Sequence, residues 1–182
     1  MKISGRSFYL RSLVKKDLSK EYFSWLKDQK VNQFLDVRFS HPSKKQAEAN
    51  LAKYDNKTSF FFGVFDKKKD KFIGTATLKI DSFNNNAYYG YLIGEKSYWG
   101  TNAGIDSIAL LMDFGFDNFK LNKIWGGTPV INIGSIFNFK KLGFVQEGRF
   151  REHAIIEGKK IDCVIFGMLK EDWLEKRKKF NY

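Results

Sequence analysis

The stretch from Tyr91 to Gly104 combines an apolar strand-like run, a turn that contains glycine, and the start of a long helical pattern. The first N–H groups of a helix have no partner within the helix, and together with the helix dipole they attract an anion. Gly100 and Gly104 would let such an anion approach the backbone closely. The stretch therefore predicts a phosphate-binding turn, although a simple cap by Asn102 would explain the same residues.

Other residue types that support catalysis are sparse. The single cysteine, Cys163, lies in an apolar strand-like run, so we expect a buried small side chain rather than a nucleophile. His41 and His153 are far apart in the sequence, and one cysteine builds neither a disulfide nor a metal cluster. The sequence therefore predicts no metal site.

The elements that would position the turn follow from the hydrophobic periodicity of the chain. Strands are expected at 8–13, 59–65, 72–80, 87–93, 123–126, 144–156 and 160–169. Helices are expected from Asp17 to about Leu26, near 44–54, from Gly104 to about Phe119, and at 132–142. The strand–helix–strand step around the third helix implies a locally parallel pair in a mixed sheet that is covered by helices.

The long third helix is amphipathic. Its apolar stripe consists of Ile105, Ile108, Ala109, Met112 and Phe116. Asp106, Asp113 and Asp117 mark the other side, which we expect to face water. The lysine run 67–69 and the basic tail 176–179 are likewise interpreted as solvated surface.

The segment Asn132–Phe144 resembles a signature of the GNAT superfamily of acyl-CoA-dependent N-acyltransferases, in the branch that acetylates ribosomal-protein N-termini. Asn132, Ser135 and the ending 141–144 match at the family's spacing. Further matches are Gly90-Tyr91, Ile93-Gly94, Tyr98-Trp99-Gly100, Glu147-Gly148 and Asp162. The resemblance spans Leu10 to about Trp173. It implies a single domain over 1–182 with an α/β, three-layer fold: a mostly antiparallel sheet with a splayed parallel pair, and helices on both faces.

The resemblance also implies a cofactor, acetyl-coenzyme A. The strand that ends at Ile93 would splay from its neighbour near Trp125, and the pantetheine arm would pair with the freed backbone groups like an added strand. Lys140 or Lys141 would approach the adenosine phosphates or lie in solvent. The implied cofactor-binding residues are Leu92, Ile93, Gly94, Gly100, Thr101, Asn102, Ala103, Gly104, Ile105, Asn132, Ser135, Phe139 and Lys141.

Four positions depart from the family pattern. In the phosphate loop, Trp99 stands at the first position, where the family has Gln or Arg, and Asn102 replaces the middle glycine. Phe139 stands where many members have a tyrosine that protonates the leaving thiolate, and Tyr88 stands where many have a glutamate base. These departures motivate an alternative, a non-catalytic acyl-CoA-binding module.

Acetyl transfer to an amine needs a neutral amine, a polarised thioester carbonyl and a route for a proton. The backbone N–H of Ile93 or Gly94 is our candidate for polarising the carbonyl. Water alone could remove the proton. Otherwise the candidate bases, some acting through water, are Tyr88, Glu95, Glu147 and His153. The catalytic assignment is Tyr88, Ile93 and Glu95.

The acceptor pocket is expected at the front of the chain, where relatives shape it. Trp25, Arg38 and Arg151 are the expected substrate-binding residues, and Phe34, Phe39, Arg149 and His153 are further candidates. Core packing for Trp25 and Phe34, a surface ion pair for Arg38, and a basic strand edge around Arg151 are the simpler interpretations.

Composition bounds the partners. The chain has 182 residues, 43% hydrophobic, and a formal net charge of +12, which favours acidic partners by long-range steering. No nucleic-acid-reading motif is present, so we do not expect a nucleic-acid partner. The family resemblance implies a small-molecule or peptide amine as acceptor, such as a protein N-terminus or a nucleotide-linked amino sugar. Without an apolar run of about 20 residues or a leader-like start, we expect a cytoplasmic N-acetyltransferase, monomeric or homodimeric, without membrane association.

Overall fold

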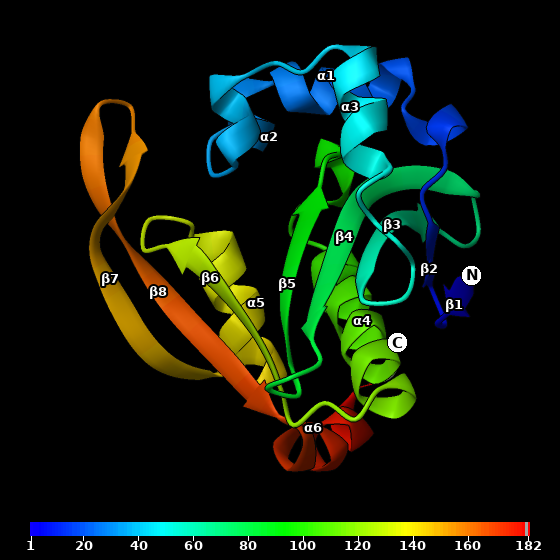
Figure 1. Ribbon diagram of the computed structural model, residues 1–182, viewed down its shortest axis with the longest axis vertical. Helices are drawn as coiled ribbons and strands as arrows, with labels where there is room; N and C mark the ends of the chain where they lie inside the picture. The colour runs from blue at the N-terminus through cyan, green and yellow to red at the C-terminus, as the bar shows by residue number, and fades with distance from the viewer. Residues whose placement is uncertain (181) are drawn as a thin grey trace.

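The computed structural model describes residues 1–180 and 182 and shows one mixed sheet with helices on both faces (Figure 1). The strands of this described part lie in the order β1-β2-β3-β4-β5-β6-β8-β7. All neighbouring pairs are antiparallel except β5–β6, which is parallel. The strands are β1 (Lys2–Ser4), β2 (Phe8–Ser12), β3 (Ser59–Asp66), β4 (Lys71–Asp81), β5 (Asn86–Ile93), β6 (Lys123–Pro129), β7 (Val145–Ile156) and β8 (Lys159–Leu169). The expected fold class is confirmed.

The helices divide between the two faces of this sheet. They are α1 (Lys20–Lys27), α2 (Gln29–Asn32), α3 (Lys44–Leu51), α4 (Ala103–Asn118), α5 (Ile133–Leu142) and α6 (Lys170–Lys176), with short 3-10 segments at Lys15–Asp17, Asp36–Phe39, Lys96–Tyr98 and Arg177–Lys179. Local periodicity does not predict β1, α2 or α6. β1 has three residues, too few for a recognisable alternation, and α2 and α6, with four and seven residues, span two helical turns or fewer. No helix in the described part of the chain is both long and apolar enough to cross a membrane.

α1 begins later than the sequence predicts. Its N-cap is Ser19, whose side chain accepts a hydrogen bond from the Tyr22 N–H at 3.4 Å. Asp17 lies before it, and its carboxylate accepts two 2.6 Å hydrogen bonds from Arg11 of β2. Asp17 therefore ties this turn to the sheet instead of opening the helix.

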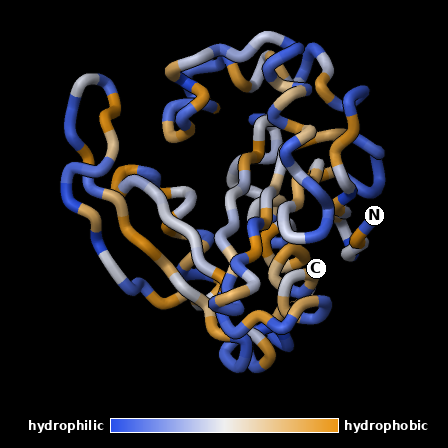
Figure 2. The backbone as a smooth tube through the Cα atoms, viewed as in Figure 1, coloured by the Kyte–Doolittle hydropathy of each residue, from blue (hydrophilic) through white to orange (hydrophobic). Residues whose placement is uncertain are grey.

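The larger core lies between the sheet and α4 with α5. Phe60 and Phe62 of β3 are fully buried and meet the edge of Phe114 at ring-centroid distances of 5.0 and 5.3 Å. The expected apolar stripe of α4 is confirmed, because Ile105, Ile108, Ala109, Met112 and Phe116 are all buried. Figure 2 shows the hydrophobic stretches along the central strands and α4. Each large side chain buried here contributes about 1.5–3 kcal/mol.

A smaller apolar cluster holds α1, α2 and α3 against the other face of the sheet. Trp25 of α1 packs on Phe72 of β4 at a ring-centroid distance of 4.9 Å, and Leu92 of β5 packs against the same cluster. Trp25 is 6% exposed. The simpler interpretation of Trp25, a core aromatic, is therefore what the structure shows.

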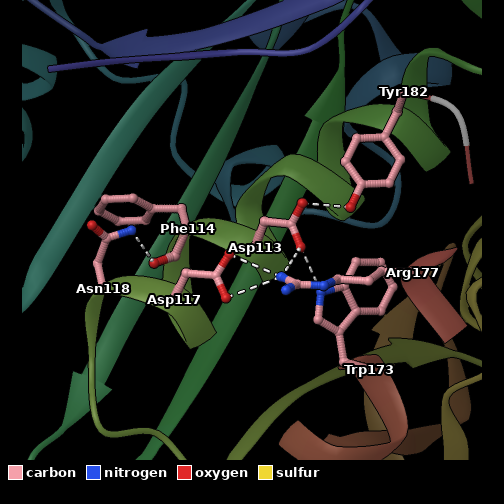
Figure 3. Close-up of polar contacts among 7 residues, drawn as sticks. All are labelled: Asp113, Phe114, Asp117, Asn118, Trp173, Arg177 and Tyr182. Atoms are coloured by element: carbon pink, nitrogen blue, oxygen red, sulfur yellow. Dashed lines mark hydrogen bonds and ion pairs between the residues drawn. The ribbon is translucent and has the colours of Figure 1, made fainter. Parts of the chain in front are cut away.

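The C-terminal segment folds back onto α4, as Figure 3 shows. Asp113 of α4 accepts hydrogen bonds from the Trp173 indole at 2.8 Å, from Arg177 at 3.1 Å and from the Tyr182 hydroxyl. Arg177 also binds Asp117 at 2.9 Å. The expectation that Asp113 and Arg177 are solvated surface is therefore wrong. We call these five residues the C-terminal clasp.

Candidate functional site

The strands β5 and β6 separate soon after they meet. Their parallel register covers only Asn86–Tyr88 opposite Lys123–Trp125, whereas β5 continues to Ile93 and β6 to Pro129. We call the unpaired region between them the seam. The expected splayed pair is confirmed, and it begins at Trp125 as the sequence predicts.

Hydrogen bonding to β4 decides which backbone groups face the seam. The N–H groups of Gly94 and Glu95 both donate to the carbonyl of Ile73, at 2.9 and 3.0 Å. Alternate residues of an antiparallel pair face the partner strand, so the N–H groups of Tyr91 and Ile93 face the seam. Gly94 was one of two candidates for polarising a carbonyl; its N–H is occupied, which corrects that expectation and leaves Ile93. The Ile93 carbonyl accepts a 2.8 Å hydrogen bond from the Trp99 indole.

The turn before α4 is capped by a different residue from the one that the sequence suggested. Gly100 has a φ of +75°, and Asn102 has a φ of −73° and makes no side-chain cap. Thr101 does the capping: its hydroxyl accepts from the Ala103 N–H at 3.2 Å and donates to the Tyr98 carbonyl at 2.7 Å. The left-handed position therefore falls on a glycine, and Asn102 in place of the family's glycine does not strain the loop.

Only the first part of this turn is open to solvent. Gly100, Thr101 and Asn102 are exposed, whereas 103–105 are buried. A Cβ on Gly104 would lie 2.7 Å from the Asn138 side-chain nitrogen and 3.7 Å from the Tyr91 ring. An anion would thus approach the exposed loop at 100–102, with the first turn of α4 beneath it.

α4, α5 and β5 meet beside the seam. The Asn138 amide donates to the Tyr91 hydroxyl at 2.8 Å. Burial raises the pKa of Tyr91, and hydrogen bonding with Ser135 and Asn138 opposes that rise. The Asn132 side chain caps α5 by accepting from the Ser135 N–H at 3.2 Å. Sequence reasoning brought Asn132 and Ser135 to this site; it missed Asn138.

Two aromatic side chains close the deep end of the seam on this helix-covered face. Phe139 is 2% exposed and stacks on Phe166 at a centroid distance of 4.4 Å. Tyr89 is equally buried, and its ring lies 5.7 Å from that of Phe139. Its hydroxyl has no hydrogen-bond partner among the described residues. Sequence reasoning passed over Tyr89, although the tyrosine-rich run 88–91 was a signal for it.

Lys140 and Lys141 follow on the outer side of α5, and both are exposed. No partner of either side chain appears among the hydrogen bonds and ion pairs of the described residues. Both charges are thus available to an anion at this end of the molecule, and solvent exposure is equally consistent with their position.

The opposite face of the seam carries a different set of groups. Tyr88 is 39% exposed and packs edge-on against Trp125 at 4.9 Å. Burial, then the nearby charges of Asp36 and Cys163, raise the pKa of the Tyr88 hydroxyl, so it stays protonated. Cys163 is buried in β8, as expected. Tyr88 is therefore placed to contact an acceptor but is poorly suited as a general base.

The other predicted acceptor residues are spread around this face. Arg38 donates to the carbonyls of Leu35 at 2.7 Å and Ile155 at 2.9 Å, so it joins the front of the chain to the β7–β8 hairpin. Arg151 is exposed on that hairpin. Its neighbour Arg149 forms an ion pair with Asp162 at 2.6 Å.

The remaining candidate bases do not gather at the seam. Glu95 forms a 2.7 Å ion pair with Lys71, which lowers the pKa of its carboxyl. Glu147 is paired with Lys123. His153 lies on the outer hairpin beside Phe150, at 5.2 Å between ring centroids. In the described part of the chain, no group of His, Cys, Asp and Glu residues could hold a metal ion.

The groups on the helix-covered face fit acetyl-coenzyme A. An extended amide-containing arm needs a strand edge with free N–H groups, and Tyr91 and Ile93 supply it. A diphosphate needs backbone donors in an exposed turn before a helix. The N–H groups of Gly100 and Asn102 have no partner among the described residues, whereas that of Thr101 donates to the Tyr98 carbonyl at 3.3 Å. The Tyr89 hydroxyl at the deep end has no hydrogen-bond partner among the described residues.

Comparisons with known proteins agree with this geometry. Residues 10–165 match the family model described as "Acetyltransferase (GNAT) domain". "Uncharacterized N-acetyltransferase p20" of Bacillus licheniformis is 32% identical over 113 residues, which are 62% of this chain and 63% of p20, less than two thirds of that protein. The "[Ribosomal protein uS5]-alanine N-acetyltransferase" of Escherichia coli is 25% identical over 142 residues, 76% of this chain and 73% of that one.

A solved structure shows the same fold. "RimL- Ribosomal L7/L12 alpha-N-protein acetyltransferase in complex with Coenzyme A" superposes with a TM-score of 0.84 at 16% identity, covering 94% of this chain and 99% of the other. Because the family model spans most of the chain, this protein belongs to the GNAT family of acetyltransferases, enzymes that use acetyl-CoA to acetylate amines.

Proposed function

We propose that this enzyme acetylates the N-terminal α-amine of a protein by direct attack of that amine on acetyl-CoA within a ternary complex. The observation that carries this proposal is the seam itself. Its helix-covered face carries the exposed turn 100–102 and the N–H groups that would bind the phosphates and the arm, and exposed aromatic and charged groups lie on the other face. Acetyl-CoA and the amine could therefore be bound at the same time, one on each face of the sheet.

The helix-covered face would hold the cofactor. The N–H of Tyr91 would pair with the arm, the turn 100–102 would hold the diphosphate, and the Asn132 side chain would bind beside them. Lys141 would approach the adenosine end. When bound, acetyl-CoA supplies an acetyl group activated as a thioester.

The acceptor face would receive an extended peptide end. Tyr88 is exposed there, and Phe39 and Phe150, at 68% and 48% exposure, lie on the flanking 3-10 segment and the β7 strand. Asp36 is fully exposed near Tyr88, with its carboxylate 3.7 Å from the Arg38 guanidinium, and this exposed carboxylate would attract the cationic end of a chain. The formal net charge of +12 would favour a substrate protein associated with RNA.

In the transfer step the amine nitrogen forms a bond to the acetyl carbon, and the carbon–sulfur bond breaks with its electron pair on sulfur. The surplus amine proton passes to water, because the candidate bases Glu95 and Glu147 are held in ion pairs with Lys71 and Lys123. The Ile93 N–H would donate to the carbonyl oxygen as negative charge grows on it. Alignment of the two reactants supplies the rest of the acceleration.

An acceptor panel tests this proposal. Purified enzyme and acetyl-CoA would be incubated with alanine- and serine-starting peptides, a nucleotide-linked amino sugar, spermidine and an N-terminally blocked peptide, and thiol release would be followed with mass detection of product. We expect acetylation of free α-amines only. Turnover of the amino sugar alone would show that the acceptor is an amino sugar and not a protein N-terminus. Binding of acetyl-CoA without turnover of any amine would contradict the proposal.

A further inference from the structure

A groove beside α1 and α3 gathers lysines from two stretches of the chain, 15–27 and 42–44. These helices lie side by side at one end of the sheet (Figure 1). The groove has a volume of about 730 Å³, and we call it the basic groove. No acidic residue of the described chain lines it, and its five lysines are Lys15, Lys16, Lys20, Lys27 and Lys44. None of its lining residues belongs to the seam or to the turn 100–102, so acetyl transfer does not explain it.

The sequence of α1 places one side of that helix in the groove and the other in the core. Lys20, Phe23 and Lys27 recur at the spacing i, i+3, i+7 and share one face of the helix. Tyr22 and Trp25 lie on the opposite face and are buried in the smaller apolar cluster. Packing within the fold therefore leaves the lysine-bearing face of α1 at the surface.

Most of the positive charge in the basic groove is not neutralised by the protein. Among the described residues, Lys15 alone of the five lysines has an ion-pair partner, Glu48 at 3.6 Å. Lysines elsewhere do meet carboxylates, as Lys71 does at 2.7 Å from Glu95. Like charges gathered in one groove repel one another, so a bound anion would stabilise this arrangement.

The two helices add to this positive charge. The caps of α1 and α3, Ser19 and Ser43, both line the groove. The positive ends of two helix dipoles therefore lie at the same place as the lysines and raise the local potential.

The floor of the basic groove is apolar and includes an aromatic ring. Leu18 is buried, and Phe23 and Pro42 are half-buried, whereas all five lysines are exposed. Phe23 packs edge-on against Tyr22 at a ring-centroid distance of 5.4 Å. An aromatic ring among lysines is the combination that binds single-stranded nucleic acid, because a base stacks on the ring while the lysines contact phosphates.

We propose that the basic groove binds the phosphate backbone of a single-stranded nucleic acid without sequence specificity. This inference goes beyond the proposed function, because it requires no acetyl transfer. A lysine holds a phosphate as a point charge, and phosphate contacts carry no sequence information. An acidic peptide has the same sign of charge but no base to stack on Phe23. A bound nucleic acid would hold the enzyme close to the proteins that coat it and raise their local concentration.

Sequence reasoning did not expect a nucleic-acid partner, and the fold shows why. Lys44 joins Lys15 and Lys20 only because α3 packs beside α1. No dense basic run marks the groove in the sequence. A groove that contacts phosphates also needs no sequence-reading motif.

The test compares wild type with two triple variants that each remove three positive charges. The groove variant carries Lys16→Gln, Lys20→Gln and Lys44→Gln. The control variant changes three exposed lysines that do not line the groove, Lys57→Gln, Lys68→Gln and Lys178→Gln. Because both variants have the same net charge, a difference between them reports on the place of the charges.

Binding would be measured by fluorescence anisotropy with labelled uridine RNA of about 12 nucleotides and with thymidine DNA of the same length, from about 50 to 200 mM salt. For wild type, contact with about four phosphates predicts a slope of about −3 for log affinity against log salt. In the groove variant, the dissociation constant should rise about 10-fold or more at the lowest salt, and the slope should become shallower by about 2. The control variant should change less than about 2-fold. The ratio of the RNA and DNA affinities identifies which nucleic acid is the partner.

Three results would overturn the inference. Wild type that binds neither oligonucleotide at about 50 mM salt has no such site. Equal weakening in both variants would assign the binding to overall charge. A glutamate peptide of the same length that binds as tightly as RNA, and loses its affinity in the groove variant, would make the partner an acidic protein.

Failure of the proposed function looks different from failure of this inference. The groove variant should acetylate a free peptide as wild type does, since none of the changed lysines belongs to the seam, and this activity also shows that the variant is folded. If none of the three proteins acetylates any amine while the groove-dependent binding of nucleic acid remains, the proposed function fails and the inference stands.

Discussion

The two ends of α4 are held in different ways. At its C-terminal half, Asp113 accepts hydrogen bonds from Trp173, Arg177 and Tyr182, and Asp117 accepts from Arg177, so the carboxylates and their donors satisfy one another (Figure 3). At its N-terminal end, the turn 100–102 is exposed and only Thr101 contributes a cap.

The difference separates stability from binding along one helix. Donors and acceptors that satisfy each other stabilise the fold, whereas backbone donors left without a partner are available to a ligand. Changes to the C-terminal clasp should therefore alter unfolding without altering cofactor affinity, whereas changes beside the turn 100–102, where α4 meets Asn138, should alter cofactor affinity.

The largest effect is expected for Asp113→Ala. The substitution leaves the fully buried Trp173 indole N–H without its acceptor and removes one partner of Arg177. We expect the free energy of unfolding in urea to fall by about 3 kcal/mol, with the dissociation constant of coenzyme A unchanged. Asp117→Ala is the control: that carboxylate is 48% exposed, so its loss should cost less than about 1 kcal/mol. A weaker coenzyme A affinity in Asp113→Ala would break the proposed separation.

The C-terminal clasp also shows what the sequence could not predict. The periodicity of α4 correctly predicted its buried stripe, since that pattern is local. The partners of Asp113 lie about 60 positions or more away in the chain, so spacing within the helix could not distinguish a carboxylate in water from one covered by the tail. For the same reason the basic run 176–179 resembled solvated surface, although Arg177 is paired.

The features of the candidate site also differ in whether they depend on local sequence or on contacts between distant residues. The splay at Trp125, the turn at Gly100 and the Asn132–Ser135 cap follow from motifs that are contiguous in sequence. The occupied N–H of Gly94 depends on pairing with β4, and the partnerless hydroxyl of Tyr89 depends on how three elements pack. Neither property is visible in a residue's neighbours along the chain.

A second prediction tests the N-terminal end. In Gly104→Val, the new Cβ would lie 2.7 Å from the Asn138 side-chain nitrogen. The Asn138 side chain would have to move, which would disturb the Asn138–Tyr91 hydrogen bond beside the seam. We expect the dissociation constant of coenzyme A to rise about 10-fold, which corresponds to about 1.4 kcal/mol. Gly148→Ala is the matched control, because nothing lies within 4 Å of a Cβ there. Unchanged affinity in Gly104→Val would show that cofactor binding does not involve this corner.

A third prediction concerns Asp106, which lies on α4 seven residues before Asp113 but has no ion-pair partner among the described residues. Burial raises its pKa to about 6. The folded-state pKa of Asp106 is above the ordinary value of 3.8, so folding favours the protonated carboxyl. The stability that this carboxyl contributes is therefore fully present below pH 3.8 and is lost as pH rises through about 6. The dipole at the helix N-terminus favours the charged form and reduces the effect.

Asp106→Asn should therefore stabilise the protein by about 1 kcal/mol at pH 7 and by much less at pH 4. Urea unfolding at the two pH values measures this difference, with Asp117→Asn as the control for removing a charge from the same helix. An equal gain at both pH values would mean that the charge of Asp106 is not penalised by its surroundings.

The smallest effect is expected for Glu95→Gln, in the segment that leads into the open turn. A general base must be able to accept a proton near the working pH, but the ion pair with Lys71 lowers the pKa of the Glu95 carboxyl and keeps it charged. The neutral amide retains the shape of the side chain. We therefore expect kcat to change less than about 3-fold and the dependence of the rate on pH to keep the same form at acidic and basic pH. Loss of the acidic limb together with a large fall in kcat would instead identify Glu95 as the base, and the closed ion pair at this corner would then have to open during turnover.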